Sequence, residues 1–251
     1  TVAVQYSYLQ SPLALVFDTA SGLDQAAATM RAVYGYWTSL PADSRPDFYL
    51  HGSSLGAWTS MSAFDIFQMV NDPIDGALWS GPPFPSDLWQ RAVAQRNAGS
   101  PYVLPEVGDG ELFRFASQFA GPGENGDEWG RMRIVFLQYA SDPIVFFDPN
   151  AAWRRPVWMR EPPAPDVSPE LRFMPLVTQV QLAVDMALSR NLPRRFGHNY
   201  VPEDYIDAWA EVAPPDGWND RDFERLKQRC GPQWGRGCRN DAISRLPDPT
   251  G

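Results

Sequence analysis

The sequence predicts an α/β protein whose mostly parallel β-sheet is covered by helices on both faces. Short apolar segments alternate with longer segments of helical periodicity along most of the chain, which is the order expected where crossover helices join parallel strands. The chain has 251 residues with 44% hydrophobic side chains, enough to bury one full core. We therefore expect a single domain over residues 1–251.

The first half of the chain alternates strand and helix three times. Each expected strand is a short apolar run, and each expected helix has apolar residues at helical spacing. Ser86 and Asp87 are residue types favoured at helix starts, so the third helix should begin there. The expected strands cover residues 2–6, 48–50 and 76–80, and the expected helices cover residues 23–40, 57–70 and the segment that follows residue 86.

The second half contains a strand-like segment at residues 111–115, a glycine-rich loop at 121–130, a strand at 132–139 and then a proline-rich insertion at about 149–195. The insertion has two interpretations. It is either a rigid connector that leads to a core helix, or a cap whose tryptophan and arginine residues meet lipid headgroups or an anionic substrate. The aromatic and basic residues are Trp153, Arg154, Arg155, Trp158 and Arg160, and the following helix carries Leu176, Val180, Val184 and Leu188 at helical spacing.

A Gly-x-Ser-x-Gly pattern, Gly52-Ser53-Ser54-Leu55-Gly56, lies between an expected strand and an expected helix. In that context the pattern is typical of a nucleophile elbow, where a strained turn exposes the serine hydroxyl and the glycines let strand and helix pass closely. Ser54 is then the candidate nucleophile, and the amide of Leu55 is a candidate oxyanion donor. The alternative is a plain surface turn closed by two glycines.

A serine nucleophile needs a base, and the chain has only two histidines. His51 lies three residues before Ser54 on the incoming strand, where it cannot easily turn toward the hydroxyl. His198 lies in an expected loop beside Gly197, which gives its imidazole freedom to approach the edge of the sheet. We therefore expect His198 to be the base.

The acid that orients the base should follow a late strand, because the chain order of this type of site is serine, acid, histidine. Asp142 lies just after the expected strand at 132–139, and its carboxylate would hold the imidazole in the tautomer that accepts the serine proton. Asp148 is the second candidate. Asp142 precedes Pro143, so it has the alternative role of a turn former.

These motifs, in this order, resemble the α/β-hydrolase superfamily. From about residue 2 to about residue 226 the chain is also similar to the catalytic region of a family of actinobacterial membrane-anchored α/β-hydrolases. This resemblance implies the α/β-hydrolase fold, a serine hydrolase activity, and a membrane-associated location in the cell envelope with the anchor outside this chain. The segments that carry the likeness are Val4-Gln5-Tyr6-Ser7-Tyr8-Leu9, Asp75-Gly76-Ala77-Leu78-Trp79-Ser80-Gly81-Pro82-Pro83, Gln138-Tyr139-Ala140-Ser141-Asp142-Pro143 and Asp204-Tyr205-Ile206-Asp207-Ala208-Trp209.

The superfamily order implies a component outside this sequence. Counted back from the elbow, the strand at 48–50 is the fifth and the strand at 2–6 the fourth, so the third strand and its oxyanion loop would precede residue 1. Without a neighbour, the strand at 2–6 would expose an apolar edge. We expect an amino-terminal polypeptide segment to complete the sheet, with this chain a processed product, or else an incomplete polypeptide. Self-cleavage before Thr1 is one route to such processing.

The sequence thus predicts a serine hydrolase of esterase or lipase type, which cleaves an ester or lipid-like small molecule through an acyl-enzyme. An acyltransferase would use the same residues, and a non-catalytic scaffold of the same fold is a further alternative. Loops at the carboxyl ends of the strands should line the substrate pocket. The expected pocket residues are Tyr6, Ser7, Tyr8, Leu9, Ser53, Gly81, Pro82, Phe84, Pro143, Ile144 and Val145.

Charge and cysteine content exclude other classes of protein. A formal net charge of −9 disfavours binding to a nucleic acid backbone. No apolar run approaches the ~20 residues that span a bilayer. Cys230 and Cys238 are close enough in sequence to form a disulfide in an oxidising compartment. No metal site is expected, because the cysteines and histidines lack zinc-ligand spacing, and no motif indicates a cofactor.

Overall fold

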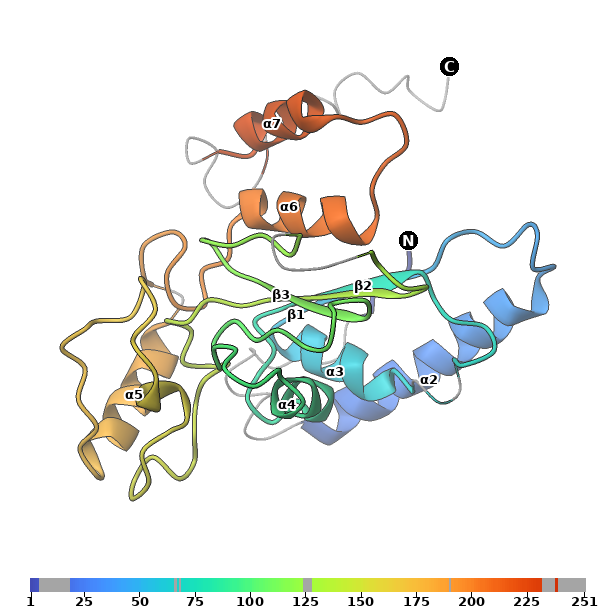
Figure 1. Ribbon diagram of the computed structural model, residues 1–251. Coiled ribbons are helices and arrows are strands. Elements are labelled where there is room, and N and C mark those ends of the chain that lie inside the picture. The colour runs from blue at the N-terminus through green and yellow to red at the C-terminus, as the bar shows by residue number, and fades with distance from the viewer. Residues whose placement is uncertain are drawn as a thin grey trace, which may run out of the picture.

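A parallel four-stranded sheet forms the centre of the computed structural model (Figure 1). The structure describes residues 1–4, 19–65, 67, 69–123, 128–189, 191–231 and 238. The strands are β1 (Tyr49–Ser53), β2 (Gly76–Ser80), β3 (Phe113–Ala116) and β4 (Arg133–Leu137), and they lie in the order β1-β2-β4-β3. All three pairings are parallel. The predicted α/β class with a parallel sheet is therefore confirmed.

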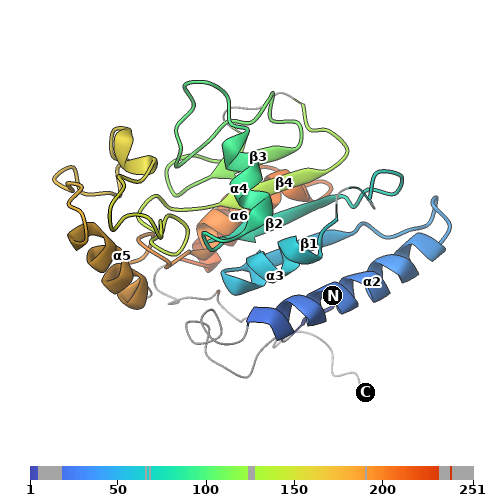
Figure 2. The same cartoon turned by 90° about the horizontal axis from the view of Figure 1, so that it is seen from below.

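Helices cover both faces of this sheet (Figures 1 and 2). One face carries α2 (Thr19–Ser39), α3 (Leu55–Ala63) and α4 (Asp87–Ala94). The other face carries α6 (Pro202–Val212), and α7 (Asp220–Arg229) lies outside α6. The insertion contributes the 3₁₀ helix η1 (Trp158–Arg160) and α5 (Val177–Leu188), which lies beyond the end of the sheet.

The two central strands divide their side chains between the two layers. On β2, Trp79 packs in the cluster formed with α3 and α4, whereas Leu78 packs in the cluster formed with α6. On β4, Phe136 and Val135 divide in the same way. All four side chains are fully buried, and each contributes roughly 2 kcal/mol through removal of apolar surface from water. This two-sided burial explains why both strands are continuous apolar runs in the sequence.

Three adjacent strands end at the same edge of the sheet. Each is followed by a residue that the sequence predicts to lie in the active site or its pocket. Ser54 follows β1, Gly81 follows β2, and Asp142 lies in the loop after β4. Because these strands are parallel neighbours, their carboxyl ends bring the three loops together. The site is built at this edge.

Two expected elements differ from the structure. Residues 1–4 are irregular and exposed, so the strand expected at 2–6 is wrong for residues 2–4, and its last two residues lie outside the described residues. No described residue pairs with the second edge of β1. The helix expected at 57–70 ends at Ala63, because the Asp65 carboxylate accepts the Phe67 amide at 3.0 Å in a local turn that competes with the helix.

The expectation of a core helix in the insertion is wrong. Leu176 is 68% and Val180 61% exposed, and Val184 and Leu188 are each half exposed. Leu182 is the large apolar residue that α5 buries. The apolar residues of α5 do recur at helical spacing, but their stripe faces outward rather than into the core.

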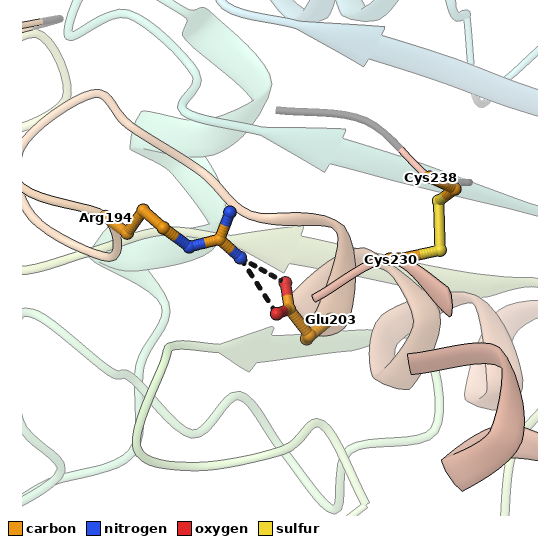
Figure 3. Close-up of a disulfide and its surroundings, with 4 residues drawn as sticks. All are labelled: Arg194, Glu203, Cys230 and Cys238. Carbon is orange, nitrogen blue, oxygen red and sulfur yellow. Dashed lines mark hydrogen bonds and ion pairs between the residues drawn. A yellow bond between two sulfur atoms is a disulfide. The ribbon is translucent and has the colours of Figure 1, made fainter. Parts of the chain in front are cut away.

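A disulfide and an ion pair restrain the carboxyl-terminal part of the described chain near α6 (Figure 3). Cys230, at the end of α7, is paired with Cys238 in a disulfide. Nearby, Nη2 of Arg194 donates to both carboxylate oxygens of Glu203 at 2.8 and 2.9 Å. The ion pair fixes the segment before His198 to the first turn of α6.

Candidate active site

The turn at Ser54 has the strained geometry of a nucleophile elbow. Ser54 has φ 56° and ψ −125°, a conformation that costs a non-glycine residue about 1–3 kcal/mol and persists only where the surroundings enforce it. Two hydrogen bonds enforce it here. The Ser54 amide donates to the Ser80 carbonyl at 2.8 Å, and the Ser54 carbonyl accepts the Trp58 amide at 3.1 Å as α3 begins. The serine is thereby held between the end of β2 and the start of a helix.

The two glycines of the motif have different roles. A Cβ atom at Gly52 would lie 2.3 Å from the carbonyl oxygen of Gly56 and 2.6 Å from the amide nitrogen of Ala57, whereas a Cβ atom at Gly56 would meet nothing within 4 Å. The close approach of strand and helix therefore requires glycine at position 52 alone. The expectation that both glycines are needed for this approach is wrong for Gly56.

The structure places His198 against the buried carboxylate of Asp142. The imidazole Nδ1 lies 2.6 Å from Asp142 Oδ2, and the two side chains are 8% and 0% exposed. Because an ionised carboxylate only accepts, Nδ1 carries the proton of this hydrogen bond and Nε2 is left as an acceptor. Asp142 Oδ1 accepts the Ile144 amide at 2.9 Å, which fixes the carboxylate relative to the turn after β4.

The imidazole of His198 and the elbow both lie against the end of β2. Ser54 is bonded to the carbonyl of Ser80, and the next residue, Gly81, packs against the His198 ring. A Cβ atom at Gly81 would lie 2.6 Å from His198 Cε1, and Gly81 has φ +53°. The Ser54 hydroxyl makes no hydrogen bond to any residue in the described part of the chain, and such bonds commonly tighten only when substrate is bound.

The loop that carries His198 is restrained at several points. The amide of Gly197 donates to the Ser141 hydroxyl at 2.9 Å, and the amide of His198 donates to the Ser189 carbonyl at 3.1 Å. Arg195 and Gln118 exchange two hydrogen bonds at 3.0 Å, each to the other's main-chain carbonyl. The candidate base is therefore positioned by the structure rather than carried on a free loop.

The other candidates for base and acid, His51 and Asp148, make different contacts. The Nδ1 atom of His51 is 2.9 Å from the Leu78 carbonyl, and its ring packs against Tyr205 and Trp209 on the α6 face of the sheet. Desolvation lowers the pKa of His51, which favours the neutral form of this ring. The Asp148 carboxylate accepts from the amide and the side chain of the nearby Asn150.

The expected pocket residues fall into three groups. Residues 6–9 lie outside the described residues. Ser53, Phe84 and Ile144 are exposed or half-buried at the carboxyl edge of the sheet, and the amide of Phe84 donates to the Ile144 carbonyl at 2.9 Å. The remaining four, Gly81, Pro82, Pro143 and Val145, are buried, and Val145 belongs to the core cluster under β4.

Three contacts at the site were not expected from the sequence. The hydroxyl of Tyr200 donates to Asp142 Oδ2 at 2.8 Å. The hydroxyl of Tyr205 lies 2.6 Å from Ser80 Oγ, beside the elbow. Gly81 was expected to line the pocket but packs against the ring of His198. Tyr200 follows the candidate base by two residues, and this spacing is the signal that could have suggested its role.

The fold and this arrangement define the class of protein. A parallel sheet, a strained serine after one strand and an aspartate–histidine pair at the same edge are the components of an α/β-hydrolase. Residues 1–226 match the model of the Alpha/beta-hydrolase family, and the chain belongs to that family. Searches of curated proteins and of solved structures found no match.

Three further observations concern membrane spans, cavities and metal sites. None of the described helices is long and apolar enough to cross a membrane. A cavity of about 650 Å³ lies between the segment after α4 and Glu161, and it is lined by none of the candidate site residues. Within the described residues, no group of three or more histidine, cysteine, aspartate or glutamate side chains is placed to hold a metal ion.

Proposed function

We propose that this member of the α/β-hydrolase family is a serine hydrolase that cleaves carboxylic esters. The observation that carries the proposal is the 2.6 Å hydrogen bond between His198 and the buried Asp142, at the sheet edge where the strained, half-buried Ser54 lies. Burial matters here, because a carboxylate shielded from water holds an imidazole in one tautomer and stabilises the imidazolium that forms during catalysis.

The proposed reaction proceeds through an acyl-enzyme. Ser54 Oγ bonds to the acyl carbon while His198 Nε2 takes the hydroxyl proton, and the proton then passes to the departing alcohol as the ester bond breaks. A water molecule attacks the acyl-enzyme next and gives its proton to Nε2. The acid product leaves, and the proton returns to Ser54. Asp142 stays ionised throughout and orients the ring.

The negative charge that develops on the acyl oxygen needs preorganised donors. Leu55 is the first residue of α3, and the first amides of a helix have no partner within the helix. Its amide is therefore free to donate, with support from the helix dipole. Removal of one such donor typically costs about 3 kcal/mol of transition-state stabilisation.

The second oxyanion donor belongs to the segment expected to complete the sheet. We propose that a separate amino-terminal polypeptide segment supplies this donor and lies beside β1, whose second edge has no partner among the described residues. An unpaired edge exposes main-chain donors and acceptors that a further strand would satisfy. Membrane association at the cell envelope is proposed on the same basis, since the anchor would belong to that segment.

The exposed apolar stripe of the insertion supports a lipid-like substrate. The outward stripe of α5, which includes Val180 and Leu188, belongs to the segment that leads directly to His198. Apolar surface on the segment that carries the proposed base favours substrates with an acyl chain over small polar esters. An acyltransferase would use the same nucleophile and base and would differ in admitting an alcohol instead of water.

A fluorophosphonate probe tests the proposed function without knowledge of the natural substrate. We expect the probe to attach to Ser54 in the protein as purified together with any segment that copurifies, because an activated serine attacks phosphorus as it attacks an acyl carbon. Intact-mass and peptide analysis would locate the adduct. Ser62, whose hydroxyl donates to the Trp58 carbonyl at 2.8 Å, should remain unlabelled. Absence of any adduct at Ser54 would favour the non-catalytic scaffold.

Replacement of Gly81 tests whether the base must lie against β2. In Gly81→Ala the new Cβ atom would lie 2.6 Å from His198 Cε1, so the imidazole must move and ester turnover should fall about 100-fold, the usual cost of a misplacement of about 1 Å. Gly108→Ala is the matched control, because Gly108 has φ +56° but open space around it. Similar losses in both variants would attribute the effect to backbone strain instead.

A further inference from the structure

The Asp142 carboxylate accepts a hydrogen bond from a third donor, the Tyr200 hydroxyl, which has no role in the proposed reaction. Asp142 Oδ2 accepts from His198 Nδ1 at 2.6 Å and also from the Tyr200 hydroxyl at 2.8 Å. The Ile144 amide binds the other carboxylate oxygen. The carboxylate is 0% exposed, so these three protein donors replace the water that would otherwise solvate its charge.

The orientation of the Tyr200 hydroxyl is set by the main chain. The amide of Tyr139 donates to the Tyr200 oxygen at 3.3 Å, which leaves the phenol proton to point at Asp142. The Tyr200 ring stacks on Tyr139 at 4.3 Å between centroids and meets the His198 ring edge-on at 5.5 Å. Burial, followed by the adjacent Asp142 carboxylate, raises the pKa of Tyr200 well above its usual value. The hydroxyl therefore stays protonated, as a donor must.

We propose that Tyr200 is a positioning residue: its hydroxyl holds the Asp142 carboxylate in the orientation that aligns His198, and it takes up part of the carboxylate charge. This role rests on the proposed ester hydrolysis. The geometry carries it, because the two donors share a single carboxylate oxygen. Rotation of the carboxylate would break both hydrogen bonds at once.

Loss of the Tyr200 hydroxyl should change the protonation equilibrium of His198 in one direction. Without Tyr200 as a donor, the full carboxylate charge acts on the imidazole, so the protonated ring is favoured and the titration of His198 moves to higher pH. The other charged groups of this region are already engaged. Asp204 pairs with Arg195 and accepts from the Tyr139 hydroxyl, and Asp166 accepts from the Ser141 amide.

The experiment is Tyr200→Phe, which keeps the ring and its stacking. The chain has only two histidines, so proton NMR resolves both imidazole titrations, and His51→Gln assigns them. We expect the His198 midpoint to move to higher pH, while that of His51 stays unchanged. For an ester substrate, kcat should fall about tenfold with little change in KM, and the acid limb of the pH profile should move in the same direction.

Two further variants keep the inference falsifiable. Tyr139→Phe is the matched control, because it removes a buried hydroxyl from the stacked ring that donates to Asp204 instead of Asp142. It should leave the His198 midpoint in place. If Tyr200→Phe does not fold, 3-fluorotyrosine at position 200 keeps the ring and the hydroxyl. It is a stronger donor and should lower the midpoint.

The outcomes separate this inference from the proposed function. Ester turnover by the unmodified protein together with an unmoved His198 midpoint in Tyr200→Phe would overturn the role of Tyr200 and leave the hydrolase proposal standing. A moved midpoint in a protein that turns over no ester would support the coupling of Tyr200 to the pair and overturn the hydrolase. Equal shifts in the Tyr200→Phe and Tyr139→Phe variants would reduce Tyr200 to a structural residue.

Discussion

Replacing Ser54 by alanine should reduce the hydrolysis of short p-nitrophenyl esters by at least about four orders of magnitude, because no other group can form the acyl-enzyme. The protein should remain folded. The Ser54 hydroxyl bonds to no described residue, so its removal leaves no buried partner unsatisfied, and alanine is no more strained than serine at φ 56°. Initial rates and the thermal midpoint of unfolding, measured on the same preparations, check both parts.

His198→Ala should cost nearly as much as Ser54→Ala, and the double variant should cost little more than either alone. The reason is that a nucleophile and its base act as a unit, so removal of one already abolishes the function of the other. His51→Ala is the matched control, since His51 bonds to the Leu78 carbonyl on the α6 face of the sheet. It should retain most of the activity.

Three results would contradict this assignment. Turnover above a few per cent in Ser54→Ala would mean that another residue forms the acyl-enzyme or that the activity belongs to a contaminant. A larger loss in His51→Ala than in His198→Ala would mean that the wrong histidine was chosen as base. Additive losses in the double variant would mean that Ser54 and His198 act in separate steps.

The central strands were predictable because both of their faces are buried. The expected strand at 76–80 coincides with β2, and the expected strand at 132–139 contains β4. Burial on both faces requires a continuous apolar run, and such a run is visible in a single sequence. The pairing order was not visible in the same way, because it depends on contacts between distant segments.

Elements whose ends or faces depend on local hydrogen bonds or on neighbouring elements were predicted less well. The sequence pattern continues through α3 to residue 70, but the carboxylate of Asp65 captures a main-chain amide and the helix stops at Ala63. The periodicity of α5 identified a helix and not the direction of its apolar stripe. Periodicity shows that one face of a helix is apolar, and only the neighbouring elements determine what covers that face.

At the site, the residues that could be predicted from the sequence are those that belong to a recognisable motif. Ser54, Asp142 and His198 could be named from chain order and context, and the structure brings Asp142 and His198 into contact. Tyr200 and Tyr205 could not be assigned, because a tyrosine near an active site has no pattern that separates a donor to a carboxylate from an ordinary core aromatic. Their roles depend on which hydroxyl faces which oxygen.

The second large effect is expected on stability, from a substitution at Gly52 in the elbow. Gly52→Ala should lower the free energy of unfolding by more than about 4 kcal/mol, or prevent folding, because overlaps of this severity belong to the extreme of measured substitutions. The Cβ atom would lie 2.3 Å from the carbonyl oxygen and 2.4 Å from the carbonyl carbon of Gly56. Both are main-chain atoms at the start of α3 and cannot move without separating the helix from β1.

Gly56→Ala is the matched control for this test, and the sequence motif treats the two glycines alike. In the structure a Cβ atom at Gly56 meets nothing within 4 Å, and the residue lies inside α3, where alanine is favoured over glycine by up to about 1 kcal/mol. We therefore expect Gly56→Ala to unfold at the same or slightly higher denaturant concentration and to retain ester turnover. Chemical denaturation followed by circular dichroism measures both variants on one scale. Equal destabilisation by the two substitutions would mean that the close approach of β1 and α3 at Gly52 is not formed, and the strained position of Ser54 would then lose its physical basis.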